Sequence, residues 1–512
     1  MKSSNPAEPV ESGGRDLAAL DLGSNSFHLI IVREEAGQIR TLDRLNEYVR
    51  LAEGLDEDNR LSEEKMVEAL EALSRIAQRL RHIDHDNIRI VATNTLRKAK
   101  NALQFVSRVE AVLDEPVEII SGKEEARLIH LGVSRTRASG PGNNLIIDIG
   151  GGSTELIIGS NESPICMESL FMGCVSLSNR FFKDGEVSRT RMDDAILSAS
   201  IELLPIVENY KKIGWDTAIG SSGSVKAVLK TVREAGWCKN LITAKGLDKL
   251  TNRLIQLGQC SPKSLPGLSD KRAPVFAGGV AVLNACFNLL GIDKMEVSDA
   301  ALREGVIHDL IGRQQHQDVR EESVNDLAMR YHVDQAHAER VEHTALAFYD
   351  QAAGDLDINE SEFRSLLRWS AKLHEIGMDI SHHQYHKHGA YIIANTDLTG
   401  FSLPERAIIA TLVRGHRRKL NQLVFNTIPD NNLKHVENLV MLLRLATTLH
   451  RPRSPLGVPD TQLKASGKFL TLFFPPEWLE SHPLTAEQFR EENKLIANRG
   501  FKIEVMPMDE ST

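Results

Sequence analysis

Two segments of the chain repeat one pattern 127 residues apart (Asp148 against Asp21), and this repeat constrains the fold more than any other feature. The first segment contains Asp21-Leu-Gly-Ser-Asn-Ser26, and the second contains Asp148-Ile-Gly-Gly-Gly-Ser-Thr-Glu155. In each, an apolar run leads into a turn of small residues and then into a second apolar run, which predicts a β-hairpin. Self-similarity over such a distance predicts two duplicated halves.

Helical and extended patterns alternate around each repeat. Apolar residues at helical spacing predict a helix over 61–81, and short apolar runs predict strands over 88–93 and 117–120. Strands mixed with helices are typical of α/β domains. We therefore predict two α/β lobes, residues 17–128 and 129–312, that face each other across a ligand-binding cleft.

The pattern changes after residue 312. A polar stretch over 313–324 predicts a linker, and the chain from 325 to 450 is almost entirely helical in pattern, for example over 362–375 and 436–450. Near the end, two strand patterns over 469–474 and 501–505 surround a helical pattern over 485–498. We predict a disordered lead over 1–16, a helical domain over 313–460 and a small α+β domain over 461–512.

Composition narrows the classes of function. The 512 residues are 41% hydrophobic and 26% charged, as in soluble globular proteins, and we find no apolar run long enough to span a bilayer. The polar N-terminus is unlike a signal peptide, which predicts a cytoplasmic protein. A net charge of −9 argues against a nucleic-acid partner. The five cysteines form no C-x-x-C pair and are predicted to be reduced.

Three turns rich in Gly and Ser are candidate phosphate cradles, because successive backbone N–H groups in such turns can point at one anion. Ordinary turns are the alternative, which three such turns make weaker. The candidate binding residues are Ser24, Asn25 and Ser26 in the first turn, Gly150, Gly151 and Ser153 in the second, and Gly223 and Ser224 in the third.

Acidic residues flank the turns. Asp148 and Glu155 are predicted to face the cleft mouth and to hold Mg²⁺, which binds hard carboxylate and phosphate oxygens. Ser121 and Glu124 form a capping box pattern at a helix start, which leaves Glu125 without a structural duty. Glu125 is either a solvated helix residue or a general base for an attacking water.

Arginines supply the candidate positive charge. Arg97 and Arg303 either bind a phosphate or form surface ion pairs. Arg414, Arg417 and Arg418 belong to a dense basic cluster, which is either a solvated helix face or a track for an anionic substrate.

Together these motifs resemble the exopolyphosphatase and guanosine pentaphosphate phosphatase (Ppx/GppA) family. The resemblance runs from about residue 17 to the C-terminus and is carried, in this order, by Asp21–Ser26, Ser121–Leu128, Asp148–Glu155, Met172–Val175, Gly220–Ser224 and Ala301–Gly305. It implies an α/β fold with two actin-like (ribonuclease-H-like, ASKHA) lobes, followed by an all-helical HD-like domain and a small α+β domain.

The resemblance also implies roles for individual residues. Glu125 matches the catalytic base, and Asp148 and Glu155 match the acids that handle metal and water. The residues that match phosphate contacts are Ser24, Asn25, Arg97, Gly150, Gly151 and Ser153. Mg²⁺ is the implied cofactor. The implied oligomeric state is a homodimer, and loose association with the inner face of the cell membrane is left open.

HD-type hydrolases hold metals with His, His-Asp and Asp residues. Here the dyad is His374-Glu375, and no Asp stands in Leu445–Thr448. His343, His388 and His416 leave a metal site open, but we expect the helical domain to form a basic wall and a dimer surface.

We predict an exopolyphosphatase that removes terminal phosphates from inorganic polyphosphate by Mg²⁺-assisted attack of a water that Glu125 activates. The Gly150–Gly152 turn and the segments 316–320 and 410–414 look closest to exopolyphosphatases. The alternative is a guanosine pentaphosphate (pppGpp) 5′-phosphohydrolase with the same cleft. More remote are an ATP phosphotransferase similar to sugar or acetate kinases, and a non-enzymatic scaffold or nucleotide sensor.

Overall fold

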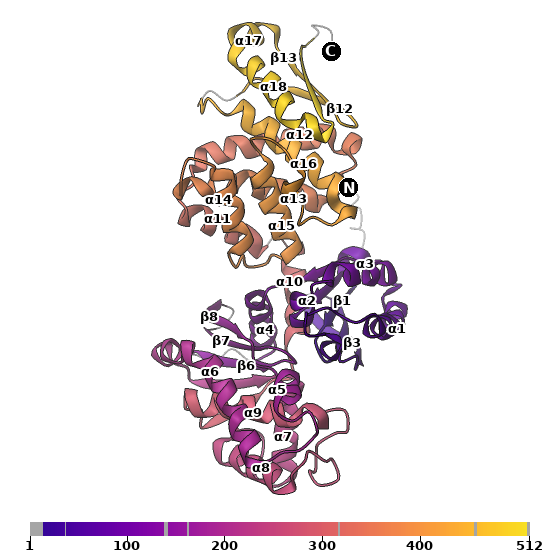
Figure 1. The fold of residues 1–512 in the computed structure, drawn as a ribbon, viewed down its shortest axis with the longest axis vertical. Helices are drawn as coiled ribbons and strands as arrows, with labels where there is room; N and C mark the ends of the chain where they lie inside the picture. The colour runs from indigo at the N-terminus through magenta and orange to yellow at the C-terminus, as the bar shows by residue number, and fades with distance from the viewer. Residues whose placement is uncertain are drawn as a thin grey trace, which may run out of the picture. The chain divides into compact units, whose positions relative to one another are not determined.

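The computed structural model describes residues 14–508 apart from 36, 138–141, 161–162, 316–317 and 455–457. The chain divides into two compact units, with the boundary between residues 317 and 318. Figure 1 labels many of the helices and strands of both units. Both copies of the sequence repeat lie in the first unit.

The first sheet has five strands in the order β3-β2-β1-β4-β5. β1, β2 and β3 form an antiparallel meander, and β4 and β5 continue from β1 in parallel. Asp21 pairs with His28 and Leu22 with Phe27, so the predicted hairpin forms. The strands are β1 Arg15–Leu22, β2 Phe27–Glu35, β3 Gln38–Glu47, β4 Ile88–Ala92 and β5 Val117–Ile119.

The second sheet has six strands in the order β10-β11-β9-β6-β7-β8. β6, β7 and β8 form the antiparallel meander, and Asp148 pairs directly with Glu155 across the second predicted hairpin. The strands are β6 Asn144–Ile149, β7 Thr154–Ser160, β8 Ser163–Leu170, β9 Thr217–Ser221, β10 Ile242–Thr243 and β11 Lys294–Val297.

The two sheets share one topology. The order β3-β2-β1-β4-β5 corresponds to β8-β7-β6-β9-β11, with the same antiparallel and parallel pairings at each step. The duplication predicted from the repeat is therefore confirmed. It places the two glycine turns at equivalent points of the two sheets.

Two helices join the sheets, α4 (Gly122–Thr136) and α10 (Leu302–Gln314). They can pack closely because Gly305 has no side chain. A Cβ at this position would overlap the backbone oxygen of Leu128. α4 contacts β7 and β8, whereas α10 contacts β1, β2 and β4, although the predicted boundaries assign α10 to the second lobe. One buried core includes Leu17, Ile30, Leu128, Ile146, Ile157 and Val306, from both sheets and both helices.

The other helices of this unit complete the lobes. α1 confirms the predicted helix over 61–81, and Ser62 caps it. The helices are α1 Glu63–Leu80, α2 Asn94–Lys98, α3 Ala102–Leu113, α5 Cys174–Phe181, α6 Arg189–Ile213, α7 Ser222–Glu234, α8 Ala244–Leu257 and α9 Ala273–Leu290.

α9 corrects the statement that no apolar run is long enough to span a bilayer. The helix has 18 residues without a charged side chain, so its length and composition would suffice, but 78% of it is buried inside the unit. It packs against α5 and α6 as a core helix of the second lobe. Two asparagines and several small residues make the run inconspicuous in the sequence.

The polar stretch over 313–324 contains the boundary between the two units, as a linker would, but most of its described residues are helical. α10 continues to Gln314, and α11 (Val319–Arg330) begins after Asp318, whose side chain accepts the backbone N–H of Arg320. The Arg320 side chain is bound by Asp318 and by Glu405 at 2.5 Å, so polar residues here join elements. The predicted disordered lead lies outside the described residues up to residue 13, but Arg15 and Asp16 belong to β1.

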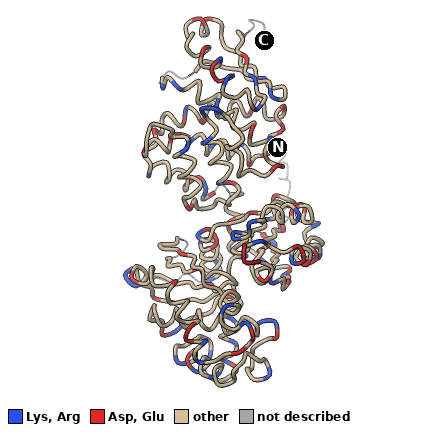
Figure 2. Tube along the Cα trace, viewed as in Figure 1, with Lys and Arg blue, Asp and Glu red and all other residues tan. Residues whose placement is uncertain are grey.

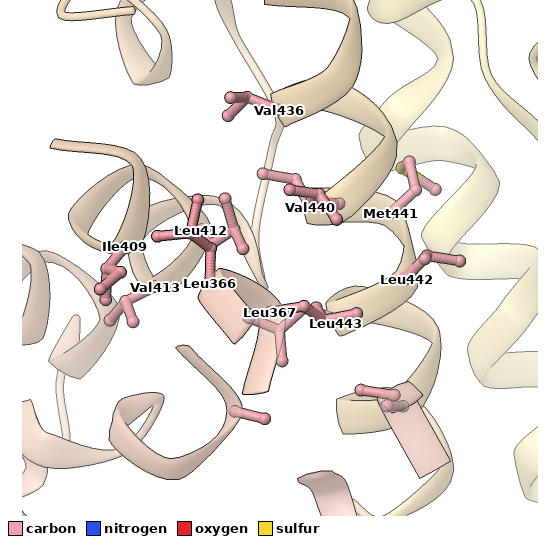
Figure 3. Close-up of a cluster of buried hydrophobic side chains, with 14 of the residues drawn as sticks. Leu366, Leu367, Ile409, Leu412, Val413, Val436, Val440, Met441, Leu442 and Leu443 are labelled. Carbon is pink, nitrogen blue, oxygen red and sulfur yellow. The ribbon is translucent and has the colours of Figure 1, made fainter. Parts of the chain in front are cut away.

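The second unit is a helical bundle that continues into a small sheet. Figure 3 shows Leu366 and Leu367 of α13 beside Leu412 and Val413 of α15, near Leu443 of α16, all buried in its core. The predicted helices over 362–375 and 436–450 are confirmed as α13 and α16. The helices are α11, α12 Gln335–Leu356, α13 Ser361–Leu373, α14 Tyr385–Asn395, α15 Leu403–Gly415 and α16 Asp430–Leu449.

The end of the chain forms the predicted α+β segment. β12 (Gln462–Ser466) pairs antiparallel with β13 (Phe469–Phe474), which pairs in parallel with β14 (Lys502–Pro507). α17 (Pro476–Ser481) and α18 (Pro483–Ile496) lie between β13 and β14 in the chain. Residues of β13 and α18 belong to the same buried cluster as the helical bundle, so the segment shares its core.

Charged residues of both signs are interspersed along both units (Figure 2). No large region of one sign stands out in that view, as expected from the modest net charge of −9. All five cysteines are free, as predicted, and Cys174 and Cys286 are buried.

Candidate active site

The two hairpin turns of the repeat meet across a cavity of about 250 Å³. A Cβ built on Gly151 would lie only 2.9 Å from Cβ of Ser24 and 3.5 Å from the backbone nitrogen of Asn25. The missing side chain at position 151 is therefore what lets the turns approach. Asp21 and Asp148, at equivalent points of the two sheets, both line this cavity, so the shared cavity predicted from the repeat is present.

Three buried carboxyl groups gather around the cavity. Burial raises the pKa of Asp21 to about 8, with repulsion from Glu125 adding to the effect. Burial likewise raises the pKa of Asp148 to about 6, although the hydroxyl of Ser221 donates to it. The pKa of Glu155 is raised by burial and by the charges of Glu125 and Asp148. Nearby positive charge would stabilise all three ionised forms.

These acids fit a divalent cation. Asp21 Oδ1 and Glu155 Oε2 are buried without a hydrogen-bond partner among the described residues. Within the same residues, no three ligand atoms of this group lie within 4.8 Å of one another, so the acids do not form a closed protein cage. Mg²⁺ suits such a site, because it binds through one or two carboxylates together with phosphate oxygens and water.

Glu155 differs from the expectation that it faces the cleft mouth. Its side chain is fully buried, accepts a hydrogen bond from Ser169 Oγ at 2.8 Å and lies outside the cavity lining. Asp148, its cross-strand partner, does line the cavity.

Glu125 lines the cavity from the first turn of α4. Ser121 caps the N–H of Glu124 as predicted, and the Glu124 carboxylate pairs with Arg127 at 2.8 Å. Glu125 is 8% exposed, and its Oε2 accepts a hydrogen bond from Arg97 Nη1 at 2.7 Å. Arg97 also donates to the backbone oxygen of Ile120 at 3.0 Å and lies outside the cavity lining, so it orients Glu125.

The opposite wall is basic. The third glycine turn joins β9 to α7, where Ser222 has a φ of +83° and Gly223 lies against Arg272. A Cβ on Gly223 would overlap the Arg272 guanidinium, which makes no ion pair among the described residues. Lys226 lines the same wall and donates to the backbone oxygen of Asp299 at 3.0 Å.

A polar chain closes one side of the cavity. His28 lies 2.8 Å from Ser26 Oγ through Nε2 and 2.6 Å from Asn46 Oδ1 through Nδ1. Burial lowers the pKa of His28 to about 4, so its imidazole is neutral at pH 7. Arg303 donates to Asn46 Oδ1 at 3.3 Å and also lines the cavity.

The structure brings most of the predicted residues together. The cavity is lined by Ser24, Asn25, Ser26, Glu125, Asp148, Gly150, Gly151, Ser153, Gly223 and Arg303. Arg97, Glu155 and Ser224 lie outside its lining. Arg414, Arg417 and Arg418 belong to the second unit, where they line a separate basic pocket of about 420 Å³.

Sequence reasoning missed several cavity residues. Asp21 had a usable signal, because it occupies the same place in the first repeat as Asp148 in the second. Tyr48, Lys226 and Arg272 have no comparable motif, and only the packing of the lobes brings them to the cavity.

Comparison with known proteins tests the resemblance. Residues 30–314 match the Ppx/GppA phosphatase family, and residues 319–493 match domain III of the same family. The chain belongs to the Ppx/GppA phosphatase family. Membership of this family implies the type of reaction, which is the hydrolysis of a phosphoric anhydride.

Close relatives cover nearly the whole chain. It is 40% identical over 473 residues to the guanosine-5′-triphosphate,3′-diphosphate pyrophosphatase of Aeromonas hydrophila, covering 92% of this chain and 95% of that one. It is 39% identical over 486 residues to the enzyme of the same name from Pseudoalteromonas translucida, covering 95% and 97%.

Solved structures confirm the Ppx/GppA fold of two actin-like lobes. An exopolyphosphatase from Cytophaga hutchinsonii superposes with a TM-score of 0.54 at 23% identity, over 58% of this chain and 98% of that one. The Aquifex aeolicus family member gives a TM-score of 0.51 at 23% identity, over 59% and 99%. The helical domain III follows these lobes in the present chain.

Proposed function

We propose that this chain hydrolyses guanosine-5′-triphosphate,3′-diphosphate (pppGpp) to guanosine 3′,5′-bis(diphosphate) and phosphate. The observation that carries the proposal is the near-full-length similarity to relatives named for this substrate, at 38–40% identity. The cavity between the glycine turns supports it, because it combines an acid on a helix start, buried carboxylates and a basic wall. The alternative weighed from the sequence thus becomes the leading function.

The chain's own residues supply the steps. The backbone N–H groups of the two turns, with Arg272 and Lys226, would hold the triphosphate. Glu125, held by Arg97, would accept a proton from water as the water oxygen attacks the terminal phosphorus. The bond from that phosphorus to its bridging oxygen breaks, and the electron pair leaves on the diphosphate. Positioning and charge stabilisation then account for most of the catalysis.

Mg²⁺ would be held by Asp148, with Asp21 of the cavity lining and Glu155 outside it supplying further negative charge. When bound, the ion would neutralise charge on the phosphate oxygens. The unpartnered oxygens of Asp21 and Glu155, and the raised pKa values of all three acids, support this assignment. We expect EDTA to abolish turnover and Mg²⁺ to restore it.

Polyphosphate is the second candidate substrate. It is favoured by the triple glycine over 150–152, which resembles the turn of exopolyphosphatases. The cavity would serve either substrate, because both present a terminal phosphoanhydride to the same turns.

The decisive experiment is a side-by-side assay of phosphate release from pppGpp and from long-chain polyphosphate, with Mg²⁺ and no acceptor molecule. We expect kcat/KM to be at least about tenfold higher for pppGpp, which corresponds to about 1.4 kcal/mol of transition-state stabilisation. A preference for polyphosphate would restore the exopolyphosphatase assignment. Phosphate release only in the presence of an acceptor hydroxyl or carboxylate would instead indicate a phosphotransferase.

A further inference from the structure

A second cavity, of about 590 Å³, lies within the second unit. Its wall includes His337 of α12, His374 and Glu375 after α13, and His416 after α15. All four side chains are buried, with exposures of 2–8%. The proposed reaction uses none of them, so their convergence needs another explanation.

Backbone contacts fix the tautomers of two of these histidines. His374 Nδ1 lies 2.7 Å from the backbone oxygen of Ala371, and His416 Nδ1 lies 2.6 Å from that of Val413. Because a carbonyl only accepts, both Nδ1 atoms carry the proton, and both Nε2 atoms present a lone pair. This arrangement is the usual way in which a protein orients a metal-binding imidazole.

The imidazoles are neutral and short of partners. Burial lowers the pKa of His374 to about 4, and it also lowers the pKa of His337 and His416. His416 Nε2 is buried without a hydrogen-bond partner among the described residues. Buried polar atoms normally find a partner, so this unpaired lone pair, on a residue of the cavity wall, points to a missing donor or cation.

Glu375 completes the group. Its Oε1 lies 3.8 Å from His337 Nε2 and 3.9 Å from His374 Nε2. Among the described residues, His337, His374 and Glu375 are the one set of three potential ligands whose donor atoms all lie within 4.8 Å of one another. Arg453 donates to both oxygens of Glu375, which holds the carboxylate as a neighbouring donor holds a metal-binding carboxylate.

We propose that His337, His374 and Glu375 bind one divalent transition-metal ion of the zinc class. Two imidazoles with one carboxylate are a ligand set for Zn²⁺ and for related first-row ions. Three protein ligands leave a coordination position open to the cavity, as in zinc sites that bind water or a small ligand.

The two nitrogen-to-oxygen distances are close to those of such a site, and the ligand nitrogens of the two histidines lie within 4.8 Å of each other. Metal bonds of about 2.0–2.1 Å in a tetrahedron place ligand atoms about 3.4 Å apart. The nitrogen-to-oxygen distances of 3.8 and 3.9 Å therefore close with shifts of a few tenths of an ångström. A water at the open position would donate to His416 Nε2 and give that atom its partner.

The arginines around the cavity are already engaged. Arg453 binds Glu375 and Asp334, Arg451 lies 3.4 Å from Glu492, and Arg417 lies over the ring of Tyr385 at 4.3 Å. Their charge, added to that of the metal, makes an anion the favoured exchangeable ligand at the open position. This metal site lies in the second unit, whereas the cavity of the proposed hydrolase lies in the first, so the two sites are separate.

The test uses the untagged full chain after treatment with a chelator, with excess Mg²⁺ present throughout. Zn²⁺ and Co²⁺ are titrated in, with binding followed by calorimetry and by the visible bands of tetrahedral Co²⁺. We expect one equivalent to bind and to raise the unfolding temperature, because a ligand of the folded state stabilises it. His337→Ala and His374→Ala should each weaken binding at least about 100-fold, since second-shell changes alone cost 10–100-fold.

His382→Ala is the matched control, because His382 lines the same cavity but is exposed and lies outside the ligand set. Its binding should equal that of the unaltered chain. If His374→Ala fails to fold, His337→Gln and Glu375→Gln decide the question. Stoichiometric binding that is unchanged in two ligand variants, or no stoichiometric binding by the unaltered chain, would overturn the proposal.

Discussion

Glu125 lies among three other acids, and its hydrogen bond from Arg97 distinguishes it as the candidate base. Asp21, Asp148 and Glu155 are buried around it, and repulsion between these groups favours protonation. Arg97 donates to Oε2 of Glu125 at 2.7 Å and so fixes the position of this carboxylate. Among the three acids that line the cavity, Glu125 is the one that an arginine of the described residues holds by a hydrogen bond.

We expect Glu125→Gln to lower kcat by about 10²–10⁴, because amide nitrogen and oxygen cannot accept the proton from water. The thermal unfolding midpoint should change little, since the substitution keeps the shape of the side chain. The matched control is Glu64→Gln, on the exposed first turn of α1. Turnover within tenfold of the unaltered chain would remove Glu125 from the role of base.

Gly223 and Arg272 form a pair in which the glycine makes room for the guanidinium. We expect Arg272→Ala to raise KM for pppGpp at least about tenfold, because charge-assisted contacts are worth about 1.5–3 kcal/mol. Gly223→Ala should produce a similar increase by displacing Arg272, and the double variant should be less than additive.

Gly354→Ala on α12 is the control for Gly223→Ala, because its added Cβ would meet only Asn359 Oδ1 at 3.9 Å. The measurement is steady-state kinetics on the unaltered chain, the two single variants, the double variant and the control. Full additivity of the two site substitutions would show that Gly223 does not act through Arg272.

Helix α10 shows how elements distant in sequence hold the lobes together. Its Asp309 is bound by Arg127 of α4, by Arg89 of β4 and by Arg313 on the same helix. Asp309, Arg89 and Arg127 are almost fully buried, and Arg313 is partly buried. Burial alone would raise the pKa of Asp309, but the three arginines hold it well below its usual range. Ion pairs of this kind cost much when one partner is removed, because the others remain buried and unpaired.

We expect Asp309→Asn to destabilise the first unit by about 3–5 kcal/mol, measured by chemical denaturation. Glu296→Gln is the control, since the Glu296–Arg137 pair is exposed and should be worth less than about 1 kcal/mol. Equal effects of the two substitutions would mean that the buried network does not join α4, α10 and β4.

Across the whole molecule, buried neutral histidines link stability to pH. Burial lowers the pKa of His374, His386 and His450 to about 4, and all three lie in the second unit. An unfolded histidine titrates near 6.5, so the unfolded chain binds more protons in acid. The stability from these groups is complete above about pH 6.5 and is lost as the pH falls towards 4.

We expect the free energy of unfolding of the second unit to fall steadily between pH 6.5 and 4.5, by at most about 1.4 kcal/mol per histidine and pH unit. The unfolding midpoint should fall with it. The chain has four tryptophans, and Trp215→Phe with Trp237→Phe leaves Trp369 and Trp478 as reporters of this unit. The measurement needs a chelator, because bound metal would oppose protonation. A midpoint that is constant over this range would contradict the prediction.

The repeat was enough to predict the two hairpins, because a hairpin depends on neighbouring residues. The duplication that it indicates then predicted two equivalent sheets, whose turns meet at a cavity that includes Asp148. Glu125 could be singled out because the capping pattern had already explained Glu124. The choice of polyphosphate over pppGpp rested on the glycine turn over 150–152 and on two short segments, 316–320 and 410–414, whereas near-full-length relatives are named for the nucleotide.

Local pattern thus determined the strands, the turns and the helix starts, since these depend on neighbouring residues. Tertiary structure decided which side chains share a cavity: Arg272 joined Gly223, Glu155 turned inward, and His337 rather than His343 met His374. It also turned the uncharged α9 into a core helix. Such outcomes depend on packing between segments far apart in the chain, and no local pattern encodes them.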